Sequence, residues 1–304
     1  MGIKRYRYTL ALAALLAAGL PSLLLDGAEA ASDTGVGVGV GVISNYRPAA
    51  ARYTLMRSPK GEQVPVQIGA VVMAGDRLAL PASASVTVQL ANNETLNLKG
   101  PGDFVIPAAK PLGKLAVIFQ SLRPILLDDE YRLDGTAASR GGDSCGKDGS
   151  AVRAIAVPIL VPGARIVTGQ RDLPLAWRGG CPPFEVRVLS GRDSLVYRES
   201  IEGWQVRLDD VPLDPGQYTI TVTDAANRRY AGTLEAVGSG PVVPEELATD
   251  TTSLGVTAQA VWLARLEDGR WKLESFERLR PLIRAGDTLA GSIGDWVLWG
   301  PSPR

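Results

Sequence analysis

A strict alternation of apolar and polar residues between positions 86 and 98 constrains the fold of this chain more than any other feature. Residues 86–91 read VTVQLA and residues 95–99 read TLNLK. A period of two is typical of a strand that buries one face and exposes the other. These segments therefore predict two neighbouring antiparallel strands, joined by the polar residues between them.

The length of the loop between these strands decides which residues face the core. A three-residue loop over 92–94 pairs Leu90 with Leu96, so that the apolar residues of both strands share one face. A two-residue turn at 92–93 places Leu90 opposite Thr95 and puts the two apolar faces on opposite sides. Because a shared apolar face can pack against a core, we predict the three-residue loop.

Upstream of this pair, Gly75 and Asp76 indicate a turn between strands predicted at 70–73 and 78–80. The Gly-Asp pair, a small polar segment and two alternating strands around a polar turn resemble the FecR domain, over about residues 64–106. Gly75 and Asp76 stand at the Gly-Asp pair of that family. The resemblance implies a β-rich module of the kind found in envelope signalling proteins.

The composition favours a turn-rich β protein and gives no support to nucleic-acid binding. The chain has 304 residues, enough for two or three domains. Its 32 basic and 32 acidic residues give a formal net charge of +0, whereas nucleic acid attracts a basic surface. The 34 Gly and 21 Pro residues suit a fold with many turns between short strands.

Residues 1–30 have the pattern of a secretory signal peptide. Lys4, Arg5 and Arg7 precede an apolar stretch at 9–25, and residues 28–30 read AEA, a small-x-small cleavage pattern. We therefore expect a periplasmic or secreted protein, without a transmembrane span if the signal is cleaved. An uncleaved N-terminal membrane anchor is the alternative.

The next segments define the expected order of domains. Residues 31–63 are a lead-in that contains GVGVGVGV at 35–42, which we interpret as a linker or a weak first strand. The strict alternation does not fit the G-x-G-x-x-G loop that binds dinucleotides. The FecR-like β domain is expected at 64–134, with a further strand at 115–119, and a Gly-rich linker at 135–150.

Several motifs in and before this linker do not support a cofactor, metal or catalytic site. The acidic run at 128–130 lacks the alternating oxygen ligands of a calcium loop. Residues 142–146 fit G-x-S-x-G, but the chain contains no histidine to accept the serine proton. Residues 141–147 fit G-x-x-x-x-G-K, but Asp148 stands where a phosphate-binding loop needs Ser or Thr.

Two cysteines, Cys145 and Cys181, predict a disulfide in an exported chain. The bond would tie the linker to the next domain, and loop closure of this size is worth roughly 4 kcal/mol. The alternative is a pair of unpaired thiols.

Residues 151–237 predict a β-sandwich, because short strands alternate with turn signals every 8–12 residues or so. The segment 213–222 reads LDPGQYTITV and resembles fibronectin type III and related immunoglobulin-like domains. In that resemblance Pro215 and Gly216 form the corner, and Tyr218 is a structural tyrosine corner. Trp177 is interpreted as a core aromatic of the sandwich, with a ligand platform as the alternative.

Residues 238–304 predict a helical hairpin and a tail. Apolar residues recur at helical spacing around 256–266, a break follows at 267–269, and a second helix is expected from Trp271 until Pro281 weakens it. Trp296 and Trp299 could form a sugar-stacking or partner-binding face. We favour the alternative, in which both side chains dock inward.

Taken together, these patterns predict a mainly β, non-catalytic envelope protein that acts as a protein–protein interaction or signalling adaptor. It needs no cofactor, and its expected partner is another envelope protein. A glycan or cell-wall binding protein is the alternative. A hydrolase is less favoured, because without histidine it would need a carboxylate pair, a Ser-Lys dyad or a metal.

Overall fold

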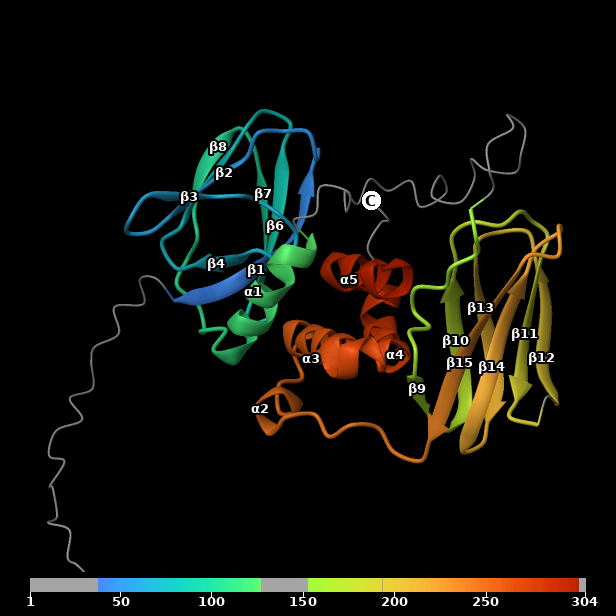
Figure 1. Cartoon of the computed structure of the whole chain (residues 1–304). Helices are drawn as coiled ribbons and strands as arrows, with labels where there is room; N and C mark the ends of the chain where they lie inside the picture. The colour runs from blue at the N-terminus through green and yellow to red at the C-terminus, as the bar shows by residue number, and fades with distance from the viewer. Residues whose placement is uncertain (1–37, 127–152, 193, 301–304) are drawn as a thin grey trace, which may run out of the picture. The chain divides into compact units, whose positions relative to one another are not determined.

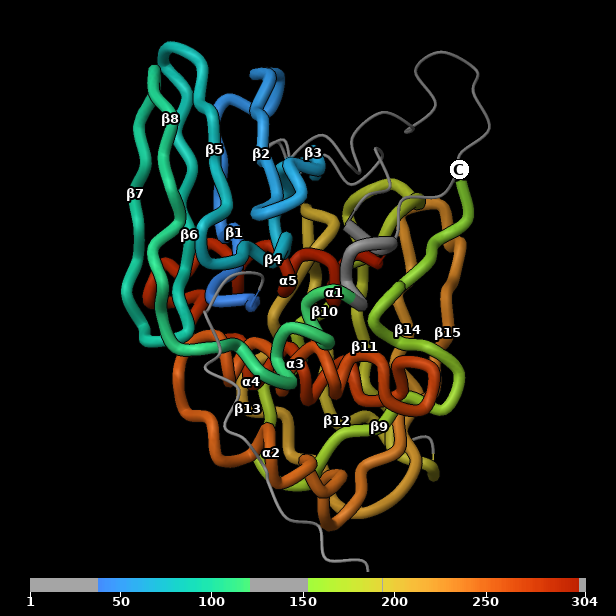
Figure 2. Tube along the Cα trace, turned by 90° about the vertical axis from the view of Figure 1, so that its left-hand side faces the viewer, coloured from blue at the N-terminus to red at the C-terminus, as the bar shows by residue number. Residues whose placement is uncertain are grey.

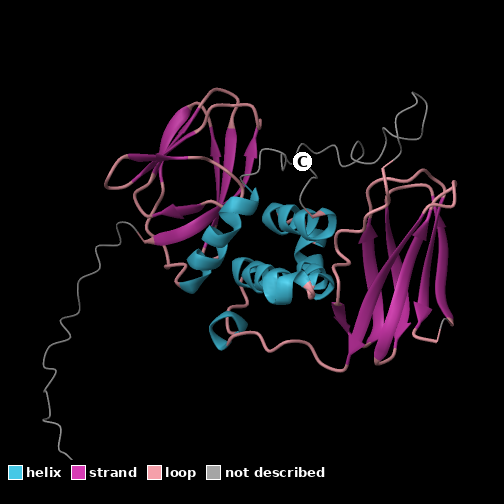
Figure 3. Cartoon of the chain, viewed as in Figure 1, coloured by secondary structure: helices cyan, strands magenta, loops and turns pink. Residues whose placement is uncertain are grey.

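The computed structural model describes residues 38–126, 153–192 and 194–300. The chain is mainly β, with several sheets and a C-terminal helical segment (Figures 1 and 3). All described residues belong to one compact unit. The fold class therefore agrees with the sequence analysis.

Eight strands form the first part of the described chain, here called the N-terminal β module. Their bounds are β1 Gly39–Arg47, β2 Thr54–Arg57, β3 Glu62–Val64, β4 Val71–Met73, β5 Arg77–Leu80, β6 Ser85–Leu90, β7 Thr95–Lys99 and β8 Gly102–Val105. They make two four-stranded sheets, in the orders β4-β1-β6-β7 and β3-β2-β5-β8. A buried apolar cluster draws residues from both sheets, among them Ile43, Leu55, Leu78 and Val88.

The Gly-Val repeat continues into a central strand of this module. Strand β1 pairs with β4 on one side and with β6 on the other. A Cβ atom at Gly39 would lie 2.9 Å from Val71 Cγ1, and one at Gly41 would lie 2.7 Å from the carbonyl oxygen of Gln89. Glycine is therefore required where the neighbouring strands β4 and β6 approach β1 closely. Strands β1 and β2 and the start of β3 come from the expected lead-in at 31–63.

In the β6–β7 pair the apolar residues share one face, as predicted, but the register differs from the predicted one by two residues. Val88 faces Leu96, and the N–H of Leu90 donates to the carbonyl of Glu94 (2.8 Å). The three loop residues are thus 91–93 and not 92–94. Asn93 takes φ 68°, a left-handed conformation that Asn tolerates and that closes a three-residue hairpin loop.

The strand predicted at 115–119 is wrong, because these residues lie in helix α1, Lys114–Leu126. Leu115 and Phe119 are both buried, four residues apart, whereas Val117 between them is 66% exposed. That spacing places the two apolar side chains on one helical face. Helix α1 contacts β4 and α3.

Seven strands form the predicted sandwich. Their bounds are β9 Ala164–Val167, β10 Gly169–Ala176, β11 Phe184–Ser190, β12 Leu195–Ile201, β13 Gln205–Leu213, β14 Gly216–Thr223 and β15 Arg229–Val237. The larger sheet has the order β12-β11-β14-β15-β9, and β10 pairs with β13. Trp177, directly after β10, is fully buried and meets Phe184 of β11 edge-on, with 5.2 Å between the ring centroids. It is a core aromatic, as expected.

Tyr218 has the geometry of a tyrosine corner. Its hydroxyl donates to the backbone carbonyl of Asp214 (3.0 Å), four residues back. Pro215 lies in the bend between them, and Gly216 takes φ 148°, which favours glycine. The bond closes the corner between β13 and β14.

The C-terminal segment contains more than a hairpin. Its helices are α2 Glu245–Ala248, α3 Ser253–Arg265, α4 Lys272–Arg284 and α5 Thr288–Trp299, with a 3-10 turn η3 at Leu266–Gly269. The break predicted at 267–269 is confirmed as η3, where Glu267 and Asp268 have positive φ. Pro281 does not end α4, which continues to Arg284.

Residues 285–287 end helix α4 and start α5, the third long helix of this segment. Gly286 (φ 81°) follows α4, and the N–H of Asp287 donates to the carbonyl of Leu282 (3.0 Å), which together form a Schellman-type C-cap. The Asp287 carboxylate then accepts from the N–H of Ala290 (2.9 Å) and caps α5. Trp296 and Trp299 of α5 are buried, so both dock inward as expected.

We expect Tyr218→Phe to lower the free energy of unfolding by about 1 kcal/mol, because it removes one largely buried hydrogen bond and little packing. Urea unfolding followed by tryptophan fluorescence measures the change. Tyr53→Phe is the matched control, since its hydroxyl also donates to a carbonyl, that of Pro48, but in an exposed place. Equal losses in both variants would contradict a structural role for the corner.

Candidate functional site

The residues singled out from the sequence do not come together in one site. Gly75 and Asp76 lie between β4 and β5, whereas Trp177 and Tyr218 belong to the sandwich. Cys181 is half-buried in the turn before β11, and its N–H donates to Asp224 (3.0 Å). Its expected partner Cys145 lies outside the described residues, so the disulfide stays a prediction. The linker motifs and the acidic run at 128–130 also lie outside them.

Asp76 organises one border of the N-terminal β module. Its carboxylate is fully buried and forms an ion pair with Arg57 (3.0 Å). It also accepts from the backbone N–H groups of Ser58 (3.0 Å) and Met73 (2.8 Å). Gly75 makes the preceding turn with φ 80°. Arg57 lies within the expected lead-in, and no sequence signal connected it with Asp76.

The border strands of the sheets are the places where another chain could pair, because they carry unused backbone N–H and C=O groups. Two borders are occupied by groups of this chain. At β4, the carbonyl of Val71 accepts from Arg57 (3.2 and 3.3 Å), and the N–H of Met73 donates to Asp76. At β9, the N–H of Arg165 donates to the carbonyl of Arg270 (2.7 Å), two residues before α4.

Two other borders are poorly suited to pairing. Strand β12 is long, but its register with β11 shifts at Val188 and Leu189, and Arg198 on it pairs with Glu185. Bulges and charged side chains are devices that keep other strands away from an edge. Strand β3 has three residues. Neither offers a regular ladder to an incoming chain.

Strand β7 is a border strand of another kind. One backbone hydrogen bond lies at each end of its pairing with β6. The N–H of Leu90 donates to the carbonyl of Glu94, and the N–H of Gly100 donates to the carbonyl of Ala84, both at 2.8 Å. Along an antiparallel pair of strands, residue pairs that are hydrogen-bonded to each other alternate with pairs that are not. The even-numbered residues of β7 therefore form the hydrogen bonds to β6. The backbone groups of the odd-numbered residues point away from β6: Thr95, Asn97 and Lys99.

Within the described part of the chain, no strand pairs with this outer side of β7 (Figure 2). The side chains of Thr95, Asn97 and Lys99 are exposed, and the register with β6 is regular throughout. We refer to these three residues as the β7 edge. Strand β8 borders the second sheet, but it is one residue shorter and follows Pro101 directly. The β7 edge is therefore the better template for an added strand.

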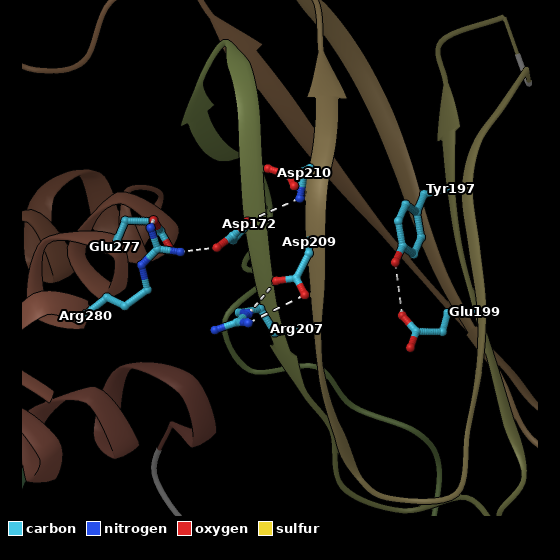
Figure 4. A network of polar contacts seen from close by, with 8 residues as sticks. All are labelled: Asp172, Tyr197, Glu199, Arg207, Asp209, Asp210, Glu277 and Arg280. Carbon is cyan, nitrogen blue, oxygen red and sulfur yellow. Dashed lines mark hydrogen bonds and ion pairs between the residues drawn. The ribbon is translucent and has the colours of Figure 1, made fainter. Parts of the chain in front are cut away.

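A second polar arrangement joins α4 to the sandwich. Figure 4 shows Arg280 of α4 reaching Asp172 of β10, with Glu277 beside it. Arg280 also contacts Glu277 (3.2 Å), and Arg171 pairs with Glu274 one turn earlier (2.7 Å). The network links opposite charges from both elements, and this arrangement holds α4 on the β10–β13 sheet.

The pKa values of two carboxyl groups in the network are shifted in opposite directions. The N–H of Asp210 and the charge of Arg280 hold the pKa of Asp172 below its usual range, against the effect of burial. Burial raises the pKa of Glu277, and Arg280 offsets part of that rise. One oxygen of Glu277, Oε1, is buried without a hydrogen-bond partner. On the opposite side of Figure 4, burial and the charge of Glu199 raise the pKa of Tyr197.

Two further observations concern the described residues alone. Their Asp, Glu and Cys side chains form no group of three or more that could hold a metal ion. None of their helices combines the length and apolar character needed to cross a membrane.

Comparison with known proteins adds little. The chain matches no protein-family model. It also matches no curated protein. Among solved structures, one similar chain is the crystal structure of CopC from Methylosinus trichosporium OB3b, at 14% identity and a TM-score of 0.22. That match covers 30% of this chain and 96% of CopC. At this TM-score the likeness carries no argument about function.

We expect Asp76→Asn to destabilise the protein by about 3–5 kcal/mol, because it leaves Arg57 without its buried partner and turns an amide N–H2 toward backbone donors. The thermal midpoint and the urea midpoint measure the loss. Asp103→Asn, an exposed change on β8, is the matched control and is expected to change stability little. A loss at Asp76 no larger than the control would contradict its structural role.

The two glutamates of α4 are expected to respond in opposite ways to neutralisation. A raised folded-state pKa means that stability falls as pH rises from the ordinary glutamate value through the raised value. Glu277→Gln removes this fall, so at pH 7 its melting temperature is expected to equal or exceed that of the parent chain. Glu274→Gln loses its charge-assisted bonds to Arg171 and to the N–H of Val167, at a cost of about 1–3 kcal/mol. Melting curves from pH 4 to 8 test both, and equal destabilisation at pH 7 would contradict the assignment.

Proposed function

We propose that this chain is an exported, non-catalytic adaptor of the cell envelope that binds an extended segment of a partner protein along the β7 edge. The observation that supports the proposal is the row of outward backbone groups on Thr95, Asn97 and Lys99. In strand addition, main-chain hydrogen bonds supply affinity, and alternate side chains supply specificity.

The chemistry of the edge agrees with a peptide partner. The exposed side chains on β7 are polar, and Lys99 and Glu94 place opposite charges at the two ends of the edge. An incoming strand therefore meets one cationic and one anionic end. Such charges favour one orientation of the partner through electrostatic complementarity. We expect a partner segment of about five residues with an acidic residue at the Lys99 end.

Burial of the tryptophans weakens the alternative of a glycan-binding surface. An aromatic platform for sugars would need exposed tryptophans in a row. Instead Trp177, Trp271, Trp296 and Trp299 are buried, and Trp204 and Trp262 are half-buried. The burial leaves the protein–protein adaptor as the better supported function. Export rests on the signal-peptide pattern of residues 1–30.

The test combines in-cell crosslinking of the tagged chain with mass spectrometry, in the parent chain and two variants. Asn97→Pro removes the central outward N–H of the edge while leaving the β6–β7 hydrogen bonds in place, and proline is tolerated on edge strands. We expect it to abolish recovery of the protein partner. Asn97→Ala is the matched control, because it loses the same side-chain contact with Thr87 but keeps the N–H. We expect it to retain the partner.

The outcomes separate the functions. Loss of the partner in Asn97→Pro alone, with an unchanged melting temperature, supports strand addition at β7. Equal recovery from both variants overturns the β7 edge as the binding site. Recovery of cell-wall fragments without a protein partner overturns the adaptor and favours the glycan binder.

A further inference from the structure

The backbone of the β7 edge is complementary to a second copy of the same edge. Its outward N–H and C=O groups belong to Thr95, Asn97 and Lys99, at every second position of the strand. Two antiparallel copies use all three positions in the register that places Asn97 opposite Asn97 of the second copy. Thr95 of each copy then lies opposite Lys99 of the other. Each such pair exchanges two hydrogen bonds, as in any antiparallel ladder.

The same register aligns the apolar side chains of the two copies. Leu96 of one copy lies opposite Leu98 of the other, on the face that points to the core. Both leucines are only half-buried, whereas Val86 and Val88, which they face on β6, are fully buried. The apolar face of the sheet is therefore partly open to solvent at this border. The leucines of a second copy cover it, and the burial of apolar area favours pairing.

The charges of the edge select the antiparallel orientation. Glu94 and Lys99 are exposed and stand at opposite ends of the edge. Antiparallel pairing brings the acidic end of each copy beside the basic end of the other, whereas parallel pairing sets like charges side by side. Two-fold symmetry makes this contact twice. The formal net charge of the chain is +0, so no overall repulsion opposes the association of two copies.

We propose that two copies of this chain pair through their β7 edges into an antiparallel, two-fold symmetric dimer. The inference concerns the same edge as the proposed function and adds its regulation, because a second copy and a strand-adding partner exclude each other. Five residues from each copy make a small interface compared with those of stable dimers. The dimer is therefore weak and dependent on concentration, which lets a partner protein displace the second copy.

The first test measures the exported full chain by sedimentation equilibrium over a range of concentrations. We expect a monomer–dimer equilibrium. Asn97→Pro removes one N–H from each copy at the two-fold axis and is expected to weaken the dimer at least about tenfold. Asn97→Ala keeps the N–H and is the matched control, with a dissociation constant within about twofold of the parent value. A dimer of parent strength in Asn97→Pro overturns the proposal.

Charge variants test the orientation without changing the backbone. Glu94→Lys and Lys99→Glu each place like charges at both junctions, and each is expected to weaken its own dimer about fivefold. An equimolar mixture of the two variants restores opposite charges, so we expect dimers of near-parent strength that contain one copy of each. Lys60→Glu, an exposed change between β2 and β3, is the matched control for net charge and leaves the dimer unchanged. A mixture that dimerises no better than either variant overturns the antiparallel register.

The outcomes separate this inference from the proposed function. A chain that is monomeric at all concentrations, but loses its envelope partner in Asn97→Pro alone, overturns self-pairing and leaves the adaptor in place. A dimer that Asn97→Pro disrupts, with no envelope protein recovered from cells, supports self-pairing and overturns the adaptor. A crosslinked species that holds two copies together with the partner overturns their mutual exclusion.

Discussion

Every strand at the border of a sheet carries backbone N–H and C=O groups that need partners, and this requirement organises the structure. At β4 the partners are the Arg57 guanidinium and the buried Asp76 carboxylate. At β9 they are the carbonyl of Arg270 and the carboxylate of Glu274. The chain thus closes two of its borders with its own charged side chains and a backbone carbonyl. The outward groups of β7 meet no such partner among the described residues.

The C-terminal helices are the second organising feature, because they extend one core through several elements. A single buried apolar cluster includes residues of β1, α1, the sandwich and α3–α5. Helix α5 contacts both β1 and β10, and Gln89 of β6 donates to Asp287 at its N-terminus (2.8 Å). The ion pairs of α4 with β10 add to this packing. A helical segment that is too short to be stable alone is therefore stabilised by tertiary contacts.

The sequence predicted which residues of the two strands share a face. It did not predict the register of the strands, or whether a short apolar run forms a strand or a helix. The alternation at 86–98 correctly gave two strands with one shared apolar face, yet the hairpin loop begins one residue earlier because Asn93 adopts a left-handed conformation. At 115–119 five apolar residues fit a strand as well as a helix, and burial of Leu115 and Phe119 on one face decided for the helix. Pro281 lies at the start of the last turn of α4, and the helix continues past it to Arg284.

The sequence by itself determined the mainly β class, the corner at Tyr218, the core position of Trp177 and the break between α3 and α4, because local periodicity and turn residues encode them. Only the tertiary structure decided that Arg57 reaches Asp76, that the Gly-Val repeat continues into a central strand, and that β7 stands at the border of its sheet. These features depend on contacts between residues far apart in the chain. No local pattern can encode such contacts, since the side chains that meet are chosen by packing.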